Sequence, residues 1–537
     1  MVDPEPLPEG PAWRQPAWII PAFYAALLAL ALVPVFSVEL LPLGDMLNHL
    51  ARAYIQNSIA SDPDLQRTYA IEWHLFSFQS TDFILPPLTK LFGLATGARL
   101  FVVATFILLI GGTAALHRAF FGRVGWWPAA AVLFLYSLPF TYGQISFLFS
   151  TGLSLLLFAA WVASMPKHGL VKVLLFSAAS FALMLCHFFA FASYALMVGA
   201  FATARAWRES DPRRRRRDLI EAGLPFVLPA IVFVLSFSAS IHGRSFYGDI
   251  FVKSIAVLSA TLTHGTWPDV IITLAVIVAV WLLQRRRLFS FARGMGFPFL
   301  ALVVAAIAMP RMLQGVLGAD LRIPLLLAFL LVAASDLAFR SRRQVLIFCV
   351  GVGALLLFRV ATITAQWQVF AADFREFRAA DAVIESGSRV VVIPFDQRQP
   401  VDRPRLPYWF VPCLAVIDRS VFLPHLYTIA TPLRFTGGRA ARLTEPALSS
   451  SSRMEWHPQR AEFANADAET IGLVRDVNRK LEAWDQATNP IYWSDWPEQY
   501  DYVIDLDFGR NQNPVPALLT EIRRGSYFTI YRIHPPQ

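Results

Sequence analysis

The sequence has little charge and almost no cysteine. Only 16% of its 537 residues are charged, whereas a soluble protein of this size carries roughly 25%. Its three cysteines, Cys186, Cys349 and Cys413, provide no Cys-x-x-Cys metal site and no disulfide framework. The chain also lacks a GxGxxG sequence, a P-loop and an internal repeat, which argues against nucleotide-binding folds of those types and against a repeat protein.

Apolar residues are what the chain has in abundance. They make up 56% of it, the mean hydropathy is +0.48, and long apolar runs recur through the first two thirds. Runs of that length can cross a hydrocarbon core of about 30 Å, so we predict a polytopic α-helical membrane protein. Much of the net charge of +9 lies in short basic loops such as 213–217, so it does not indicate a nucleic-acid partner.

About eleven transmembrane helices are expected. The first, 18–38, has no small-residue cleavage site after it and is interpreted as a retained signal-anchor. The others are expected near 98–117, 127–142, 145–164, 170–187, 189–207, 219–239, 267–283, 295–310, 321–339 and 344–364.

Basic residues occupy every second loop, which places those loops in the cytoplasm. Residues 1–16 are then a cytoplasmic tail, 17–365 the transmembrane domain, 39–97 its first outer loop, and 366–537 an extracytoplasmic domain. In that last part we predict strands at 388–394, 500–505 and 527–533 and helices at 466–487 and 515–524, which together indicate a small α/β domain. The expected location is a bacterial-type inner membrane, with the C-terminal domain in the periplasm.

A short polar stretch, 41–52, follows the first apolar run. Asp45 and His49 are four residues apart and would share one face of a helix. Apolar residues at helical spacing from Leu47 to Ile59 predict that this helix lies along the membrane surface. Asp45 alternatively serves as the helix N-cap, and the sequence leaves both roles open.

The plan of the chain, with Gly44-Asp45-x-x-x-His49 after the first span, resembles the GT-C superfamily of integral-membrane glycosyltransferases. That superfamily includes the protein O-mannosyltransferases, the aminoarabinose transferases of lipid A and the oligosaccharyltransferases. The resemblance implies transfer of a sugar from a polyprenyl-phosphate donor, with Asp45 as general base and His49 orienting it or binding a metal. The family's second acidic motif has only candidates here, Asp62, Asp64, Glu72 and Asp82, so a divalent metal cofactor stays an open question.

Positive charges at the outer ends of the later spans run against the usual bias. Because ionisable groups at such depths are costly and arginine suits bidentate phosphate binding, we expect a donor-phosphate site there. Its candidates are Arg322 and Arg311 first, then Arg359 and Arg244. The alternatives are that Asp320 simply pairs with Arg322, or that an arginine reaches toward lipid headgroups.

His187 and His264 also fall near outer span ends and, with Asp320, are possible accessory residues. The predicted partners are the lipid-linked donor, a lipid or cell-envelope glycan acceptor, and membrane lipids. Two other functions stay open: a glycan polymerase or ligase with a pyrophosphate-linked donor, and a lipid or glycan transporter. A transporter would often show inverted repeats, and no such symmetry is evident.

Overall fold

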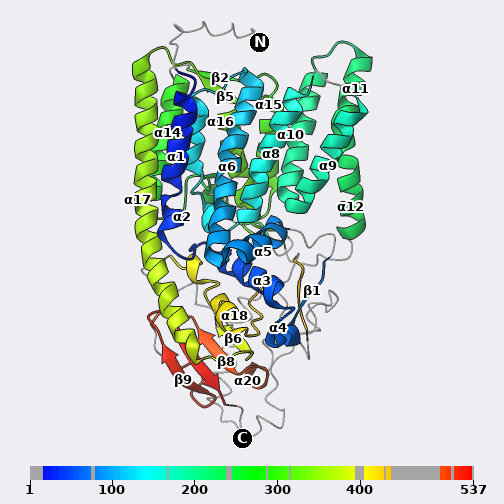
Figure 1. The fold of residues 1–537 in the computed structure, drawn as a ribbon. Helices are drawn as coiled ribbons and strands as arrows, with labels where there is room; N and C mark the ends of the chain where they lie inside the picture. Colours follow the sequence, from blue (N-terminus) through cyan, green and yellow to red (C-terminus); the bar gives the residue numbers. More distant parts are fainter. Residues whose placement is uncertain are drawn as a thin grey trace.

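The computed structural model describes residues 16–73, 79–165, 169–237, 245–248, 250–285, 288–313, 316–393, 404–427, 431–436, 496–509 and 513–534. A bundle of helices forms most of the molecule, and a small sheet near the C-terminus lies beyond one end of it (Figure 1). The predicted helix at 466–487 and the candidate Arg244 fall outside the described residues.

Six helices of the described part are long and apolar enough to cross a membrane. They are α6 (Leu94–Phe121), α8 (Ile145–Ala163), α10 (Phe188–Ala206), the run Pro212–Leu235 that joins α11 (Pro212–Gly223) to α12 (Val227–Phe237), α14 (Trp267–Arg285), and α17 (Arg342–Ala380). Three shorter apolar helices accompany them: α1 (Ile19–Ala31), α9 (Leu170–Cys186) and α15 (Gly296–Ala308).

The expected number of about eleven spans is not confirmed by helix length. The region predicted at 127–142 forms a 3-10 helix, η1 (Trp127–Phe134), and the short α7 (Leu138–Thr141). Pro139 is tolerated in the first turn of α7, but it has no N–H to continue a helix from η1 into α7. The region predicted at 321–339 gives α16 (Arg322–Ala333), whose 12 residues extend only about 18 Å. Both segments are largely buried among longer helices.

The outward faces of the long helices carry large exposed apolar side chains. Examples lie on α9 (Leu174, Leu175), α12 (Val234, Leu235), α14 (Ile277, Trp281), α15 (Leu300, Ile307) and α17 (Leu346, Ile347). Water-soluble monomers rarely expose apolar surface on this scale, whereas lipid would cover it at no cost. Composition, helix length and this surface together identify a membrane protein.

The two ends of the bundle differ. The beginning of the described chain, α11 and the strand pair β2 (Phe289–Phe291) with β5 (Ser335–Leu337) lie at one end, and α3, α4, α18 and the C-terminal sheet lie at the other (Figure 1). Arg123 pairs with Asp336 at 2.7 Å and so joins two of the basic loops at the first end.

α2 (Val33–Ser37) ends the first apolar run. The polar segment that follows forms α3 (Met46–Ser58), α4 (Pro63–Thr68) and α5 (Ser80–Phe92). A helix is therefore present where the sequence predicted one, and its first eight residues are all buried beneath α5 and α18 (Cys413–Arg419). β1 (Tyr69–Ile71) pairs antiparallel with β7 (Leu433–Phe435), which ties this segment to the C-terminal part.

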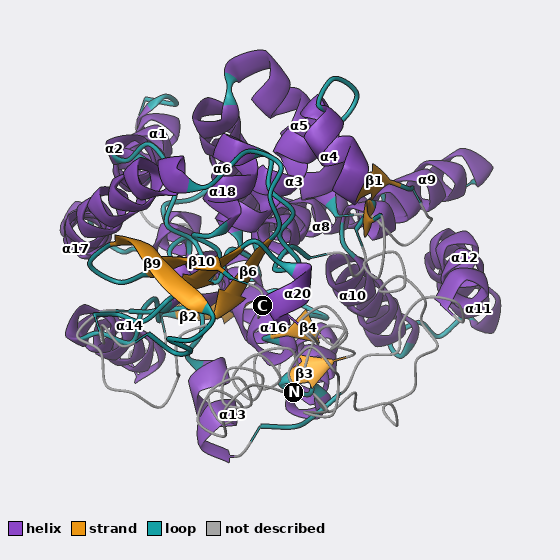
Figure 2. Cartoon of the chain, turned by 90° about the horizontal axis from the view of Figure 1, so that it is seen from below, coloured by secondary structure: helices purple, strands orange, loops and turns teal. Residues whose placement is uncertain are grey.

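The C-terminal sheet has the order β6-β8-β10-β9, and Figure 2 shows it from below against the ring of helices. β6 (Val390–Ile393) runs parallel to β8 (Tyr502–Asp505), and β10 (Thr529–Ile533) is antiparallel to both β8 and β9 (Leu519–Arg524). The helix predicted at 515–524 is wrong. Residues 519–524 form the edge strand β9, whose charged side chains are mostly exposed, and charge on an edge strand protects against aggregation.

Short elements complete the chain. They are α13 (Ile250–Val257), β3 (Met312–Leu313), β4 (Val316–Leu317), η2 (Leu224–Phe226), η3 (Ala319–Leu321), η4 (Asp381–Val383), η5 (Leu406–Tyr408) and α20 (Trp496–Gln499). The long α17 continues from the bundle to the sheet, where the Tyr527 hydroxyl donates to the Asp373 carbonyl at 3.0 Å and Phe377 packs on Phe528.

Candidate active site

Asp45 is held in place by its backbone. The Gly44 amide donates to the Thr141 carbonyl at 2.8 Å, and the Asp45 amide donates to the Tyr142 carbonyl at 3.0 Å. Gly143 follows in the left-handed region, and a Cβ there would lie 2.4 Å from the Asp45 nitrogen. Only glycine therefore allows the turn after α7 to approach the start of α3 this closely.

The Asp45 side chain does not act as a helix cap. The residue occupies the N-cap position of α3, but its carboxylate accepts no capping hydrogen bond. It faces the positive charges of Arg52 and Arg322 instead, with the Tyr427 hydroxyl nearby. Within 40–53, Asp45 is the one residue that is not fully buried.

Burial raises the pKa of Asp45 to about 7, although Arg52, Arg322 and the Tyr427 hydroxyl each lower it. A carboxylate with this pKa is half protonated near neutral pH. It is consequently a much better proton acceptor than an ordinary aspartate and suits general base chemistry.

A second carboxylate, Asp82, forms an ion pair with Arg52, whose charge also acts on Asp45. The Arg52 Nη2 atom lies 2.7 Å from Asp82 Oδ1 and 2.9 Å from His49 Nδ1, with all three side chains buried. Burial raises the pKa of Asp82 to about 6, against the opposing effect of Arg52. Of the four sequence candidates for a second acidic residue, Asp82 is the one that joins the site: Asp62 caps α4, Asp64 pairs with Arg67, and Glu72 is exposed.

His49 orients its surroundings and is not free for chemistry. One ring nitrogen accepts from Arg52, and the other donates to the Gly143 carbonyl. Burial and the nearby Arg52 charge hold the pKa of His49 well below its usual value, so the ring is neutral. With both nitrogens engaged, His49 has no lone pair for a metal, and no group of three His, Cys, Asp or Glu side chains in the described residues is arranged to hold one.

Arg322 supplies an unsatisfied positive charge beside Asp45. It is the first residue of α16 and is 5% exposed. Its Nε donates to Gln144 Oε1 at 3.3 Å, its guanidinium lies over the Phe189 ring at 4.5 Å, and its Nη1 has no hydrogen-bond partner. Asp320 does not pair with it, since that carboxylate bonds to Arg311. A buried guanidinium with a free nitrogen is a site for an anionic ligand.

Arg311 and Asp320 lie on the other side of the same turn. Arg311 donates to Asp320 Oδ1 at 3.2 Å and to the Tyr142 hydroxyl at 3.4 Å. Tyr142 also carries the carbonyl that binds the Asp45 amide. The structure thus brings Arg311, Arg322 and Asp45 together around residues 142–144.

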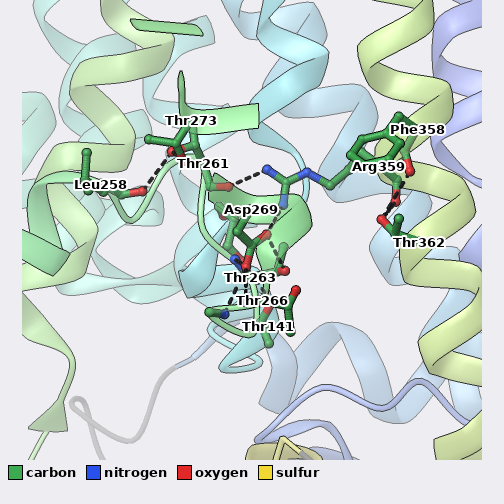
Figure 3. Close-up of polar contacts among 12 residues, drawn as sticks. Thr141, Leu258, Thr261, Thr263, Thr266, Asp269, Thr273, Phe358, Arg359 and Thr362 are labelled. Atoms are coloured by element: carbon green, nitrogen blue, oxygen red, sulfur yellow. Dashed lines mark hydrogen bonds and ion pairs between the residues drawn. The ribbon is translucent and has the colours of Figure 1, made fainter. Parts of the chain in front are cut away.

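Arg359 belongs to a different cluster, which Figure 3 shows in close-up. Its guanidinium donates to Asp269 at 2.6 Å and also to the Thr261 carbonyl. Asp269 accepts further hydrogen bonds from Thr263 and from the Gly265 amide at 2.9 Å. Arg359 therefore ties α17 to α14 as a structural ion pair, and the structure does not place it with the phosphate candidates.

The two candidate histidines are also separated. His187 lies at the junction of α9 and α10, 5.5 Å from the Phe147 ring, on the Arg322 side of the site. His264 packs against Phe370 of α17 beside the Asp269 cluster, and burial lowers its pKa to about 4. His187 thus borders the candidate site, whereas His264 belongs to the structural cluster.

Sequence reasoning missed two residues of the site, Arg52 and Tyr427. Arg52 lies three residues after His49 and seven after Asp45, so helical spacing alone could have placed it on the same face. Tyr427 comes from the far end of the chain, and no local pattern connects it with Asp45.

No protein-family model and no curated protein matches the chain. Two solved structures resemble it, both of ArnT from Cupriavidus metallidurans. The apo structure has a TM-score of 0.47 at 12% identity, and the structure bound to undecaprenyl phosphate has a TM-score of 0.41 at 14% identity. Each comparison covers 95% of this chain and 97% of that one.

Proposed function

We propose that this protein is a membrane glycosyltransferase. It moves a sugar from a polyprenyl-phosphate carrier to a lipid or cell-envelope glycan acceptor at the outer side of the cytoplasmic membrane. The observation that carries the proposal is the carboxylate of Asp45, a partly exposed residue with a pKa of about 7, set beside the guanidinium of Arg322, whose Nη1 has no hydrogen-bond partner. One group can take a proton, and the other can hold an anionic leaving group.

In the reaction, the acceptor hydroxyl attacks the anomeric carbon of the donor sugar. A new C–O bond forms while the bond from that carbon to the phosphate oxygen breaks, and polyprenyl phosphate leaves with the bonding electron pair. Asp45 accepts the hydroxyl proton, and Arg322 stabilises the negative charge that grows on the phosphate. Arg311, with Tyr142, lies close enough to this turn to contribute a second donor.

The surroundings suit a lipid-linked donor. Arg322 stands where the apolar α16 begins, with Phe147 and Phe189 against its guanidinium. A phosphate bound there would leave its polyprenyl chain to run along apolar helices, while the sugar would face the polar segment around α3. Undecaprenyl phosphate, the ligand named for one of the similar ArnT structures, belongs to this chemical class.

The test is transfer by the purified protein in lipid vesicles, with a panel of polyprenyl-phosphate sugars as donors. Removing a general base costs about 10²- to 10⁴-fold in rate, so the Asp45→Asn variant should lose at least 99% of the wild-type rate. Asp64→Asn is the matched control, because Asp64 lies in the same polar segment but only pairs with Arg67 near the surface.

Retention of transfer by Asp45→Asn would overturn the assignment of the base. Transfer only from pyrophosphate-linked donors would indicate a polymerase or ligase instead. Substrate uptake into vesicles without any covalent product would indicate a transporter.

A further inference from the structure

Three helices, α8, α10 and α16, begin in contact with one another beside the turn that follows α7. The Arg322 Nε atom, at the start of α16, donates to Oε1 of Gln144, the residue before α8, at 3.3 Å. The Arg322 guanidinium carbon also lies 4.5 Å from the ring centroid of Phe189, in the first turn of α10. His187, the residue before α10, packs on Phe147 in the first turn of α8, with ring centroids 5.5 Å apart. Each helix start therefore contacts the other two.

No side chain caps any of these three helix starts. The first amide N–H groups of a helix have no partner inside the helix, and that end carries roughly half a positive elementary charge. Three such ends at one place create a positive potential, and their amide groups can donate to an anion. Helix ends alone do not identify a ligand, but two buried side chains at the same junction add an independent indication.

Two buried nitrogen atoms at this junction have no hydrogen-bond partner among the described residues. They are Arg322 Nη1, on a residue that is 5% exposed, and His187 Nδ1. Both side chains lie against the same two rings, because the Arg322 guanidinium carbon is also 5.8 Å from the Phe147 centroid and the His187 ring is 6.0 Å from that of Phe189. A buried donor without a partner costs free energy, so such groups persist where a ligand completes them.

His187 is fixed in the break between α9 and α10. Its backbone is extended there, its amide donates to the Leu183 carbonyl at 2.9 Å, and its carbonyl accepts from the Phe191 amide at 3.1 Å. The carbonyl of the preceding residue, Cys186, accepts from the Ser146 hydroxyl at 3.3 Å. These contacts hold the main chain of His187 and use neither nitrogen of its ring.

We propose that His187 is a phosphate-binding residue. Its imidazole, the Arg322 guanidinium and the uncapped start of α10 together hold the phosphate of the lipid-linked donor, an inference that rests on the proposed function. Polyprenyl phosphate, the leaving group, carries more negative charge than the sugar-linked donor, so the junction stabilises the phosphate most once the sugar has left. Because Gln144 belongs to the turn whose Tyr142 carbonyl accepts from the Asp45 amide, a phosphate at this junction lies close to the candidate base.

The first test is binding of a polyprenyl phosphate to the full-length protein in lipid nanodiscs, with the corresponding polyprenol as an uncharged probe. The His187→Phe variant keeps a ring against Phe147 and Phe189 but removes the N–H donor. We expect it to bind the polyprenyl phosphate about tenfold more weakly than wild type and the polyprenol equally well. His264→Phe is the matched control, since that histidine packs on Phe370 of α17 instead, and it should bind both probes as wild type does.

Thermal unfolding separates a binding role from a structural one. Because His187 Nδ1 has no partner in the described part of the protein, His187→Phe should unfold at or above the wild-type temperature. The rise in melting temperature on adding the polyprenyl phosphate should be smaller in the variant than in wild type. A lower melting temperature together with wild-type binding would show that the histidine is structural and would overturn the inference.

Binding and sugar transfer are measured on the same preparations. If wild type transfers sugar and His187→Phe binds the polyprenyl phosphate as tightly as wild type, the phosphate-binding role is wrong and the proposed function stands. If His187→Phe loses affinity for the polyprenyl phosphate but not for the polyprenol, and wild type transfers sugar from no donor, the glycosyltransferase function is wrong and the phosphate site stands.

Discussion

Two buried arginines stand near the same end of the bundle, and their terminal nitrogens have different surroundings. Around Arg359, both terminal guanidinium nitrogens are engaged although Nε has no hydrogen-bond partner, and Asp269 accepts four hydrogen bonds from the 263–266 loop besides its ion pair. Around Arg322, one terminal nitrogen has no hydrogen-bond partner, and Nε donates to the neutral side-chain amide of Gln144 and not to a carboxylate.

This difference in hydrogen-bond partners indicates a structural role for Arg359 and a ligand-binding role for Arg322. A buried polar cluster whose members satisfy one another holds helices together and has nothing left to offer a ligand. A cluster that leaves a charged nitrogen unsatisfied costs stability, and such sites persist where a ligand completes them. The same residue type at the same depth therefore takes two roles, which are set by its partners.

The largest effect on stability is expected from breaking the satisfied cluster. Asp269→Ala leaves the guanidinium of Arg359 buried and uncompensated, which should lower the free energy of unfolding by about 3–5 kcal/mol. Thermal unfolding in detergent measures this loss. The double variant Asp269→Leu with Arg359→Leu should recover much of it, because no charge is then left unpaired. A loss below about 1 kcal/mol in the single variant would contradict the structural role.

A smaller effect, and on activity rather than stability, is expected at the other arginine. Arg322→Gln should lower kcat/KM for the lipid-linked donor by about 10- to 100-fold, which corresponds to one lost charged hydrogen bond of about 1.5–3 kcal/mol. Its melting temperature should stay near that of wild type. Arg375→Gln, at an exposed arginine on α17, is the control and should leave transfer within twofold. Equal kcat/KM in the two variants would show that Arg322 does not bind the donor phosphate.

The smallest effect is a gain in stability that depends on pH. The pKa of Asp45 is raised in the folded protein, so the wild type loses stability as pH rises from the ordinary aspartate pKa of about 4 to about 7. Asp45→Asn cannot ionise and should be more stable than wild type by about 1–3 kcal/mol at pH 8, with a smaller difference at pH 5. Unfolding curves at both pH values check this. A destabilised Asp45→Asn at pH 8 would show that the carboxylate is a structural group.

The sequence predicted the parts of the site that follow local rules. Asp45 is conspicuous because a carboxylate directly after an apolar run is rare, and Arg322 because a basic residue at that end of a span opposes the usual bias. Arg359 satisfied the same rule and yet has a structural role. Its partner Asp269 lies ninety residues away on another helix, and only the three-dimensional packing brings the two together.

Helices were predicted best where they are long and continuous, as for α6, α8 and α14. The segments at 127–142 and 321–339 have the composition of spans but are shorter helices enclosed by others, and hydropathy cannot distinguish burial in protein from burial in lipid. The residues of β9 were predicted to be helical. They form a strand because the turn at Gly525, and not their own side chains, sets their pairing with β10.

The unbroken length of α17 limits which insertions and chimeric proteins can fold correctly. Its 39 residues extend about 58 Å, which is nearly twice the thickness of a hydrocarbon core. The same continuous helix therefore packs against both the bundle and the sheet. One residue inserted near Asp373 would turn everything after it by about 100° and advance it by 1.5 Å. Chimeras that join this membrane part to another C-terminal part must therefore preserve helical phase, or the contacts of Asp373 with Tyr527 and of Phe377 with Phe528 will be lost.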